Sequence, residues 1–190
     1  GEGVGNPGSV GARYDLIVGE HNLLFGLNVG DGEVTGGNYR NDNGQRNGLT
    51  TKVDNKAQNV EAFAMDRWQF TSQWTLVYGA QAVWAAREIE NIEVTSGEAR
   101  DPQADYDSIN PRIGVLYNIV DDVTLFSNVS RVFEPPTNFE LEDDVRASQE
   151  TLDAMHGTVV EFGSRGAHAL PRASEMHWEV SLYYGWIDDE

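Results

Sequence analysis

The sequence predicts an all-β protein, in which about eight antiparallel strands form a portion of an up-and-down transmembrane β-barrel. Three observations lead to this fold class. Apolar and polar residues alternate with a period of two over many segments, which is typical of strands with one apolar and one polar face. Tryptophans bracket several apolar faces, as they do at the two surfaces of a bilayer. Short connections alternate along the chain with long ones, as in barrels with short periplasmic turns and long extracellular loops.

The first predicted hairpin has strands at residues 10–18 and 23–29, joined by a short turn at 19–22. Both strands place aliphatic and aromatic residues on one side and polar residues or glycine on the other. The following stretch, 30–56, is rich in Gly, Asn, Asp and Thr, without a regular apolar face. It therefore predicts a long loop.

The second hairpin has strands at 57–70 and 74–90, with a turn at 71–73. Asp66 interrupts the apolar face of the first strand. The second strand has the clearest alternation in the chain, and its small apolar residues lie between Trp74 and Trp84. A second long loop is expected at 91–107.

The third hairpin covers 108–133, with a turn at Val120-Asp121-Asp122. In a barrel, this pattern directs Arg112 and Asn128 into the lumen. It directs an apolar stripe into lipid, formed by Ile113, Val115 and Leu125. The Pro-Pro pair at 135–136 then ends the strand. A long acidic segment follows at 134–157. Its stretch 145–155 is the one place where a short helix is expected.

The last two strands are predicted at 158–166 and 175–187, with a connection of middling length between them. Nine charged residues fall on the polar strand faces: Arg13, Asp15, Glu61, Arg67, Arg87, Arg112, Glu161, Arg165 and Glu179. A narrow sealed barrel would have to pair all of them in its interior. A wide, wet or plugged lumen accepts them readily.

The composition narrows the classes of function. The chain carries 31 acidic and 13 basic residues, a net charge of -18, so nucleic acid is not an expected partner. The chain contains no run of about 18 apolar residues, so no transmembrane helix is predicted. There is no cysteine and therefore no thiol chemistry. The chain starts without methionine and ends near a strand, which suggests a fragment.

No motif points to catalysis, so no enzyme activity, catalytic residue or cofactor is predicted. The four histidines, His21, His156, His168 and His177, are scattered and are expected to be solvated. Glu140, Glu142, Asp143 and Asp144 carry oxygen ligands suited to a cation. A solvated acidic loop explains them more simply, and no metal site is predicted.

Four pieces of the sequence resemble the barrel of TonB-dependent outer-membrane receptors of the ferric-siderophore uptake type. They are EAFAMDRWQFTSQWTLVYGAQ at 61–81, INPRIGVLYNIVDDVTLFSNVSRVFEPPTNFEL at 109–141, VEFGSRG at 160–166 and EVSLYYGWIDDE at 179–190. Their order and spacing carry the resemblance, which covers residues 55–190. Residues 1–55 match only in their rhythm of strands and loops.

The resemblance implies that residues 1–190 are part of a barrel of about 22 strands, without its plug domain or its closing strand. It implies uptake of a ferric siderophore or similar metal chelate across the outer membrane of a Gram-negative bacterium. TonB, acting through the missing plug region, and outer-membrane lipid would be the partners. Four arginines are candidate ligand contacts in the lumen or at its rim: Arg87, Arg112, Arg131 and Arg165.

Two alternatives remain open from the sequence. One is a complete eight-stranded outer-membrane protein with a structural or adhesive role. The other is a soluble β-sandwich that acts as a binding module, in which the Trp-bracketed faces would pack on a protein core.

Overall fold

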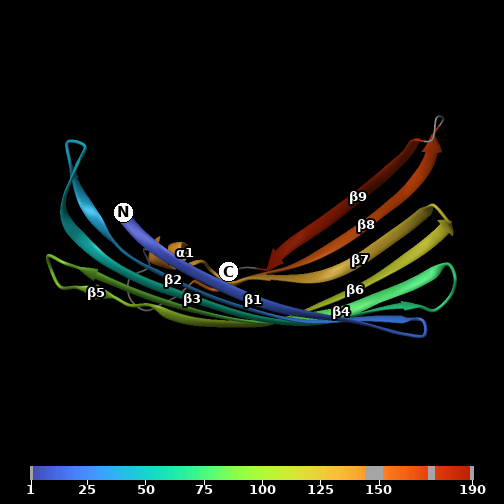
Figure 1. Ribbon diagram of the computed structural model, residues 1–190, viewed down its shortest axis with the longest axis horizontal. Coiled ribbons are helices and arrows are strands. Elements are labelled where there is room, and N and C mark those ends of the chain that lie inside the picture. Colours follow the sequence, from blue (N-terminus) through green and yellow to red (C-terminus); the bar gives the residue numbers. More distant parts are fainter. Residues whose placement is uncertain (1, 144–151, 171–173, 189–190) are drawn as a thin grey trace.

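The computed structural model is a single curved antiparallel sheet, described for residues 2–143, 152–170 and 174–188 (Figure 1). Its strands are β1 (Glu2–Val18), β2 (His21–Asp42), β3 (Gln45–Gln69), β4 (Trp74–Glu93), β5 (Ala99–Arg100), β6 (Gln103–Val120), β7 (Val123–Glu134), β8 (Met155–Leu170) and β9 (Ser174–Asp188). One short helix, α1 (Asn138–Asp143), follows β7. The prediction of about eight strands is confirmed, since β5 is only a two-residue addition to the edge of β4.

Each long strand pairs with its neighbours in the chain, in the order β1-β2-β3-β4-β6-β7-β8-β9. This is the up-and-down order of the predicted barrel. The described strands form one sheet with no second sheet packed against it, so the β-sandwich alternative is wrong. Within the described residues no pairing joins β1 to β9, and the sheet stays open rather than closing as a small barrel.

The strand registers divide the side chains between two faces. The concave face holds α1, which lies inside the curve of the sheet (Figure 1). Arg87 and Asn59 lie on this face, because Arg87 bonds both Asn59 and the segment that leads into α1. Alternation along each strand then places all nine charged residues predicted for the polar face on this same concave face.

The convex face is mostly apolar, as predicted, in the part of the sheet nearest the short turns. Ile113, Val115 and Leu125 lie on it, while Arg112 and Asn128 lie on the concave face. Trp74 and Trp84 both lie on the convex face of β4. They are separated by about 34 Å of strand, or about 24 Å of height at a tilt of about 45°, which matches the apolar band of an outer-membrane barrel.

The concave face of the sheet contains two places where an aromatic ring lies over a glycine. Phe63 covers Gly26 on the neighbouring strand, and Phe126 covers Gly163. A methyl group at either glycine would overlap the ring. The glycines therefore let these rings lie flat against the wall.

The structure corrects the predicted long loop at 30–56. These residues continue β2 and β3 as a regular hairpin of 22- and 25-residue strands. The hairpin turns at Asn43 and Gly44, which have φ of 54° and 85°, as a type I′ turn requires. The prediction failed because both faces of the hairpin are polar here, so no alternation marks the strands; the Asn-Gly pair was the signal that remained.

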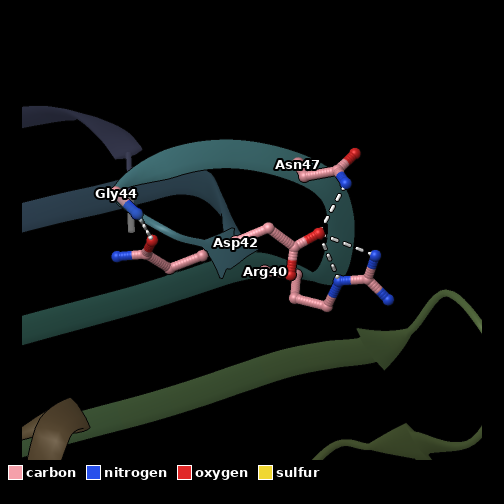
Figure 2. A network of polar contacts seen from close by, with 5 residues as sticks. Arg40, Asp42, Gly44 and Asn47 are labelled. Atoms are coloured by element: carbon pink, nitrogen blue, oxygen red, sulfur yellow. Dashed lines mark hydrogen bonds and ion pairs between the residues drawn. The ribbon is translucent and has the colours of Figure 1, made fainter.

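The tip of this hairpin is held by its own side chains (Figure 2). The Arg40 guanidinium and the Asn47 amide both donate to Asp42 Oδ2, at 2.9 and 2.6 Å. The main-chain N–H of Gly44 donates to Asn41 Oδ1 at 2.8 Å. These contacts close the turn without any other part of the sheet.

The other two predicted loops are also partly regular. Most of 91–107 belongs to β4, β5 and β6. In the long segment after β7, the helix is at Asn138–Asp143 rather than at 145–155, much of which lies outside the described residues. No helix among the described residues is long and apolar enough to cross a membrane. The turns at 19–20, 70–73 and 121–122 lie at one end of the sheet and the β2–β3 tip at the other (Figure 1).

Candidate functional site

The concave wall brings two of the four candidate arginines together. Arg112 and Arg165 line a hollow of about 240 Å³ formed by β4, β6, β7, β8 and β9. Asn128, Glu161 and Glu179 line it as well. The hollow is therefore a mixed-charge surface with guanidinium donors and carboxylate acceptors side by side.

Some of the polar side chains that line this hollow contact one another. Asn128 Nδ2 donates to Glu161 Oε2 at 2.7 Å across β7 and β8. Arg165 lies opposite Glu179 in the register and 5.8 Å from the centre of the Phe126 ring. Arg165 and Glu179 also border a second hollow of about 530 Å³ at the short-turn end, next to Asp121 and His177.

Arg87 lies apart from this hollow and is buried. Its guanidinium donates to three main-chain carbonyl oxygens, those of Pro136, Gln58 and Ala86, at 3.0, 3.1 and 2.9 Å. It also donates to Asn59 Oδ1 at 3.0 Å. Since these acceptors belong to β3, β4 and the chain after β7, Arg87 joins elements that are far apart in the sequence. This is a structural role, and it leaves the side chain little freedom to reach a ligand.

The segment that Arg87 holds, residues 135–143, is named here the inward segment. It leaves β7, crosses the concave face and contacts β3 and β4 (Figure 1). Asn138 Nδ2 donates to the carbonyl oxygen of Lys56 at 3.3 Å. Leu141 of α1 is buried, whereas Phe139, on the opposite side of the helix, is 74% exposed. The inward segment thus narrows the concave side at the end away from the short turns.

A capping box starts α1. The Thr137 main-chain N–H donates to Glu140 Oε2 at 2.8 Å, and the Glu140 N–H donates to Thr137 Oγ1 at 3.3 Å. The hydrogen bonds from Thr137 lower the pKa of Glu140 below its ordinary value. Glu140 is therefore engaged in the helix start rather than free for a cation.

Of the four carboxylates of the weaker cation site, only that of Glu140 is among the described side chains; those of Glu142, Asp143 and Asp144 lie outside them. In the described part of the chain, no group of three or more His, Asp or Glu side chains is arranged to hold a metal ion.

Arg131 lies on the convex face, near the end of β7. Its guanidinium is 3.5 Å from His156 Nδ1 on β8. It does not join the other three arginines on the concave wall.

One polar cluster was missed by the sequence analysis. His21 and Tyr78 both bond Asp66 on the convex face, where apolar residues dominate. The available signal was Asp66 itself, the residue that interrupts an otherwise apolar stripe. Histidine at the start of β2 gave no signal, because position 21 was expected to lie in a solvated turn.

The arrangement has the properties of a passage wall rather than of a catalytic centre: a charged, curved inner face and an apolar outer face. The family model for the TonB dependent receptor-like, beta-barrel matches residues 3–190. This family consists of transport receptors in the outer membrane of Gram-negative bacteria.

Two individual receptors are similar to this chain in sequence. The chain is 30% identical over 87 residues to the metal-pseudopaline receptor CntO of Pseudomonas aeruginosa (strain UCBPP-PA14), covering 43% of this chain and 12% of that protein. It is 23% identical over 117 residues to the ferric-pyoverdine M114 receptor PbuA of Pseudomonas sp. (strain M114), covering 60% of this chain and 14% of that protein.

The fold is similar to that of the ferric yersiniabactin uptake receptor FyuA from Yersinia pestis. The TM-score is 0.71 at 13% identity, and the match covers 99% of this chain and 29% of the receptor. The chain thus spans about an eighth of its curated relatives and under a third of this structure. With the matching family model over nearly all of its residues, the chain belongs to the TonB-dependent receptor-like β-barrel family.

Proposed function

We propose that this chain is part of the barrel of an outer-membrane receptor that imports a ferric siderophore or similar metal chelate. The receptor is a transporter and not an enzyme, and it releases its cargo when TonB acts on a plug domain inside the barrel. Neither nucleic acid nor a resident metal takes part. The observation that carries the proposal is the family match over residues 3–190, together with a charged concave wall and an apolar convex one.

Within this function, Arg112 and Arg165 are proposed to face the passage. Both lie on the concave wall and line the same hollow, and planar guanidinium groups suit the carboxylate and catecholate oxygens of chelates or the polar groups of a plug. Arg87 is proposed to act indirectly, by fixing the inward segment. Arg131 is proposed to make no contact in the passage, because it lies on the other face.

The test uses the full-length receptor in its host, under iron limitation. Uptake of ⁵⁵Fe is measured with a panel of defined ferric chelates of the hydroxamate, catecholate and carboxylate classes. At least one chelate should enter, and entry should stop when the receptor or TonB is deleted or when a protonophore is added. No TonB-dependent entry of any ferric chelate, together with normal growth of the deletion strain, would overturn the assignment.

The residue assignment is tested by Arg112→Gln and Arg165→Gln, with Arg131→Gln as the matched control. Surface binding of the chelate at 0 °C and uptake at 37 °C are measured separately. The two concave variants should reduce uptake by about tenfold, as expected for a lost charge-assisted hydrogen bond. The control should behave as wild type. Equal losses in all three variants would argue that overall charge, not position on the wall, is what matters.

A further inference from the structure

A carboxylate lies on the lipid-facing surface of this barrel wall. Asp66 is opposite Leu23 on one side in the strand register and Tyr78 on the other, and Tyr78 is opposite Ile113. Its neighbours in that row are otherwise apolar or aromatic. Only 5% of Asp66 is exposed, so other side chains cover the charge. A leucine or alanine would suit a lipid-facing position at lower energetic cost.

The cluster around Asp66 fixes one histidine. His21 Nδ1 lies 2.6 Å from Asp66 Oδ2, and the Tyr78 hydroxyl donates to the same oxygen at 2.8 Å. The His21 ring stacks on Trp68, with centroids 5.5 Å apart and planes inclined by 10°. The His21 side chain remains 41% exposed. Since Nδ1 is engaged, Nε2 is the nitrogen left for a further partner.

The position of His21 corresponds to the headgroup level of the periplasmic leaflet. It is the first residue of β2, directly after the short turn that contains Glu20. Aromatic rings characteristic of a membrane interface lie at the same end of the convex face, in the contacting pairs Trp68–Phe70 and Trp74–Tyr117. From water towards the membrane core, the chain thus presents a carboxylate, an imidazole and then leucine.

This order matches the groups of one kind of lipid. In a phospholipid with a primary ammonium, the ammonium is outermost, the phosphate lies below it and the acyl chains follow. An imidazolium has N–H donors on both nitrogens, one for Asp66 and one for a phosphate oxygen. The exposed Glu20 suits the ammonium, and a chain of net charge -18 disfavours lipids with a net negative headgroup.

We propose that His21, held by Asp66 and Tyr78 and stacked on Trp68, binds the phosphate of a zwitterionic aminophospholipid in the periplasmic leaflet, with Glu20 contacting its ammonium. The site rests on the outer-membrane location of the family and is independent of which chelate is transported. It belongs to the outside of the barrel and needs neither plug nor cargo.

The experiment uses the full-length receptor, reconstituted in nanodiscs of equimolar phosphatidylethanolamine and phosphatidylglycerol and released gently for native mass spectrometry. Wild type should retain phosphatidylethanolamine about tenfold more than His21→Phe, the loss expected for one charge-assisted hydrogen bond. His21→Phe preserves an aromatic ring for Trp68. The matched control is His177→Phe, because His177 forms a similar pair with Glu175 Oε2 at 3.3 Å but lies on the concave face.

Two further results decide the proposal. Equal lipid retention by wild type and His21→Phe would overturn it, as would an equal loss in His177→Phe. In nanodiscs of equimolar phosphatidylethanolamine and phosphatidylcholine, Glu20→Gln, which leaves the Asp66 cluster intact, should abolish the preference for phosphatidylethanolamine; an unchanged preference would overturn the ammonium assignment. Migration of unheated samples on SDS gels confirms that each variant is folded.

Discussion

At the scale of single residues, the buried guanidinium of Arg87 joins elements that the chain separates by dozens of positions. Its guanidinium bonds four neutral oxygens, three of them on the main chain. A flexible ammonium cannot reproduce such a fork of donors. The inward segment therefore depends on one side chain more than on its own six-residue helix, which is too short to be stable alone.

We predict that Arg87→Met releases the inward segment. The substitution leaves the buried carbonyl oxygen of Pro136 without the Arg87 donor, at a cost of about 1–3 kcal/mol. Hydrogen exchange of peptides covering 135–143 should quicken in the full-length receptor, while exchange in β6 and β7 stays unchanged. Arg131→Met, on the convex face, should leave all of these rates as in wild type.

The capping carboxylate makes this segment sensitive to acid. The pKa of Glu140 is lowered in the folded state by hydrogen bonds from Thr137, so the ionised form is the one that stabilises α1. That contribution is complete above the ordinary pKa of 4.5 and is lost as pH falls through the lower folded value.

The chain has no cysteine, so Phe139→Cys gives a single spin-label site within it, on the exposed side of α1. Label mobility should stay constant between pH 7 and pH 5 and increase as the pH falls below 4.5. Adding Glu140→Gln, which keeps a capping acceptor but cannot ionise, should remove this step. A step that persists in Glu140→Gln would assign the titration to another group.

At the scale of strands and turns, the strands could be predicted from the sequence more fully than the connections between them. Alternation identified every long strand in the part where one face meets lipid. There, apolar residues recur at every second position, as they do from Trp74 to Trp84. The sequence did not predict the parts of these strands that extend into water, because neither face of 30–56 is apolar. The concave positions of Arg112 and Arg165 followed from parity alone. The contacts of Arg87 could not be predicted, because they depend on a chain reversal after β7 that no local pattern records.

Close packing of rings over glycines gives a prediction for β8. In Gly163→Ala, the new methyl group would lie 2.7 Å from the Val180 carbonyl oxygen and against the Phe126 ring. Overpacking of this kind costs about 1–3 kcal/mol. The urea midpoint, followed by the heat-modifiable band on SDS gels, should fall. Gly185→Ala on the neighbouring strand is the matched control, because its nearest atom lies at 3.5 Å. Equal midpoints for the two variants would contradict the packing argument.

At the scale of the whole molecule, the described sheet has two long open edges, β1 and β9. Unpaired edge strands are templates for pairing with another chain. We predict that residues 1–190, refolded alone in detergent, associate into dimers or larger species. Light scattering coupled to size-exclusion chromatography measures the mass, and the full-length receptor provides the comparison. A monodisperse monomer of 21.0 kDa protein mass would show that the edges are protected in some other way.

The β2–β3 hairpin has a practical consequence for cell-surface labelling. A membrane strand needs about 10 residues, whereas β3 has 25, so more than half of it stands outside the bilayer. The Asn43-Gly44 turn at its end is held by its own side chains and carries no other element. An epitope tag inserted between Asn43 and Gly44 should therefore be displayed well above the bilayer, on a stiff stalk, without disturbing the wall below it. Antibody staining of intact cells would then count receptors and report their orientation in a single measurement.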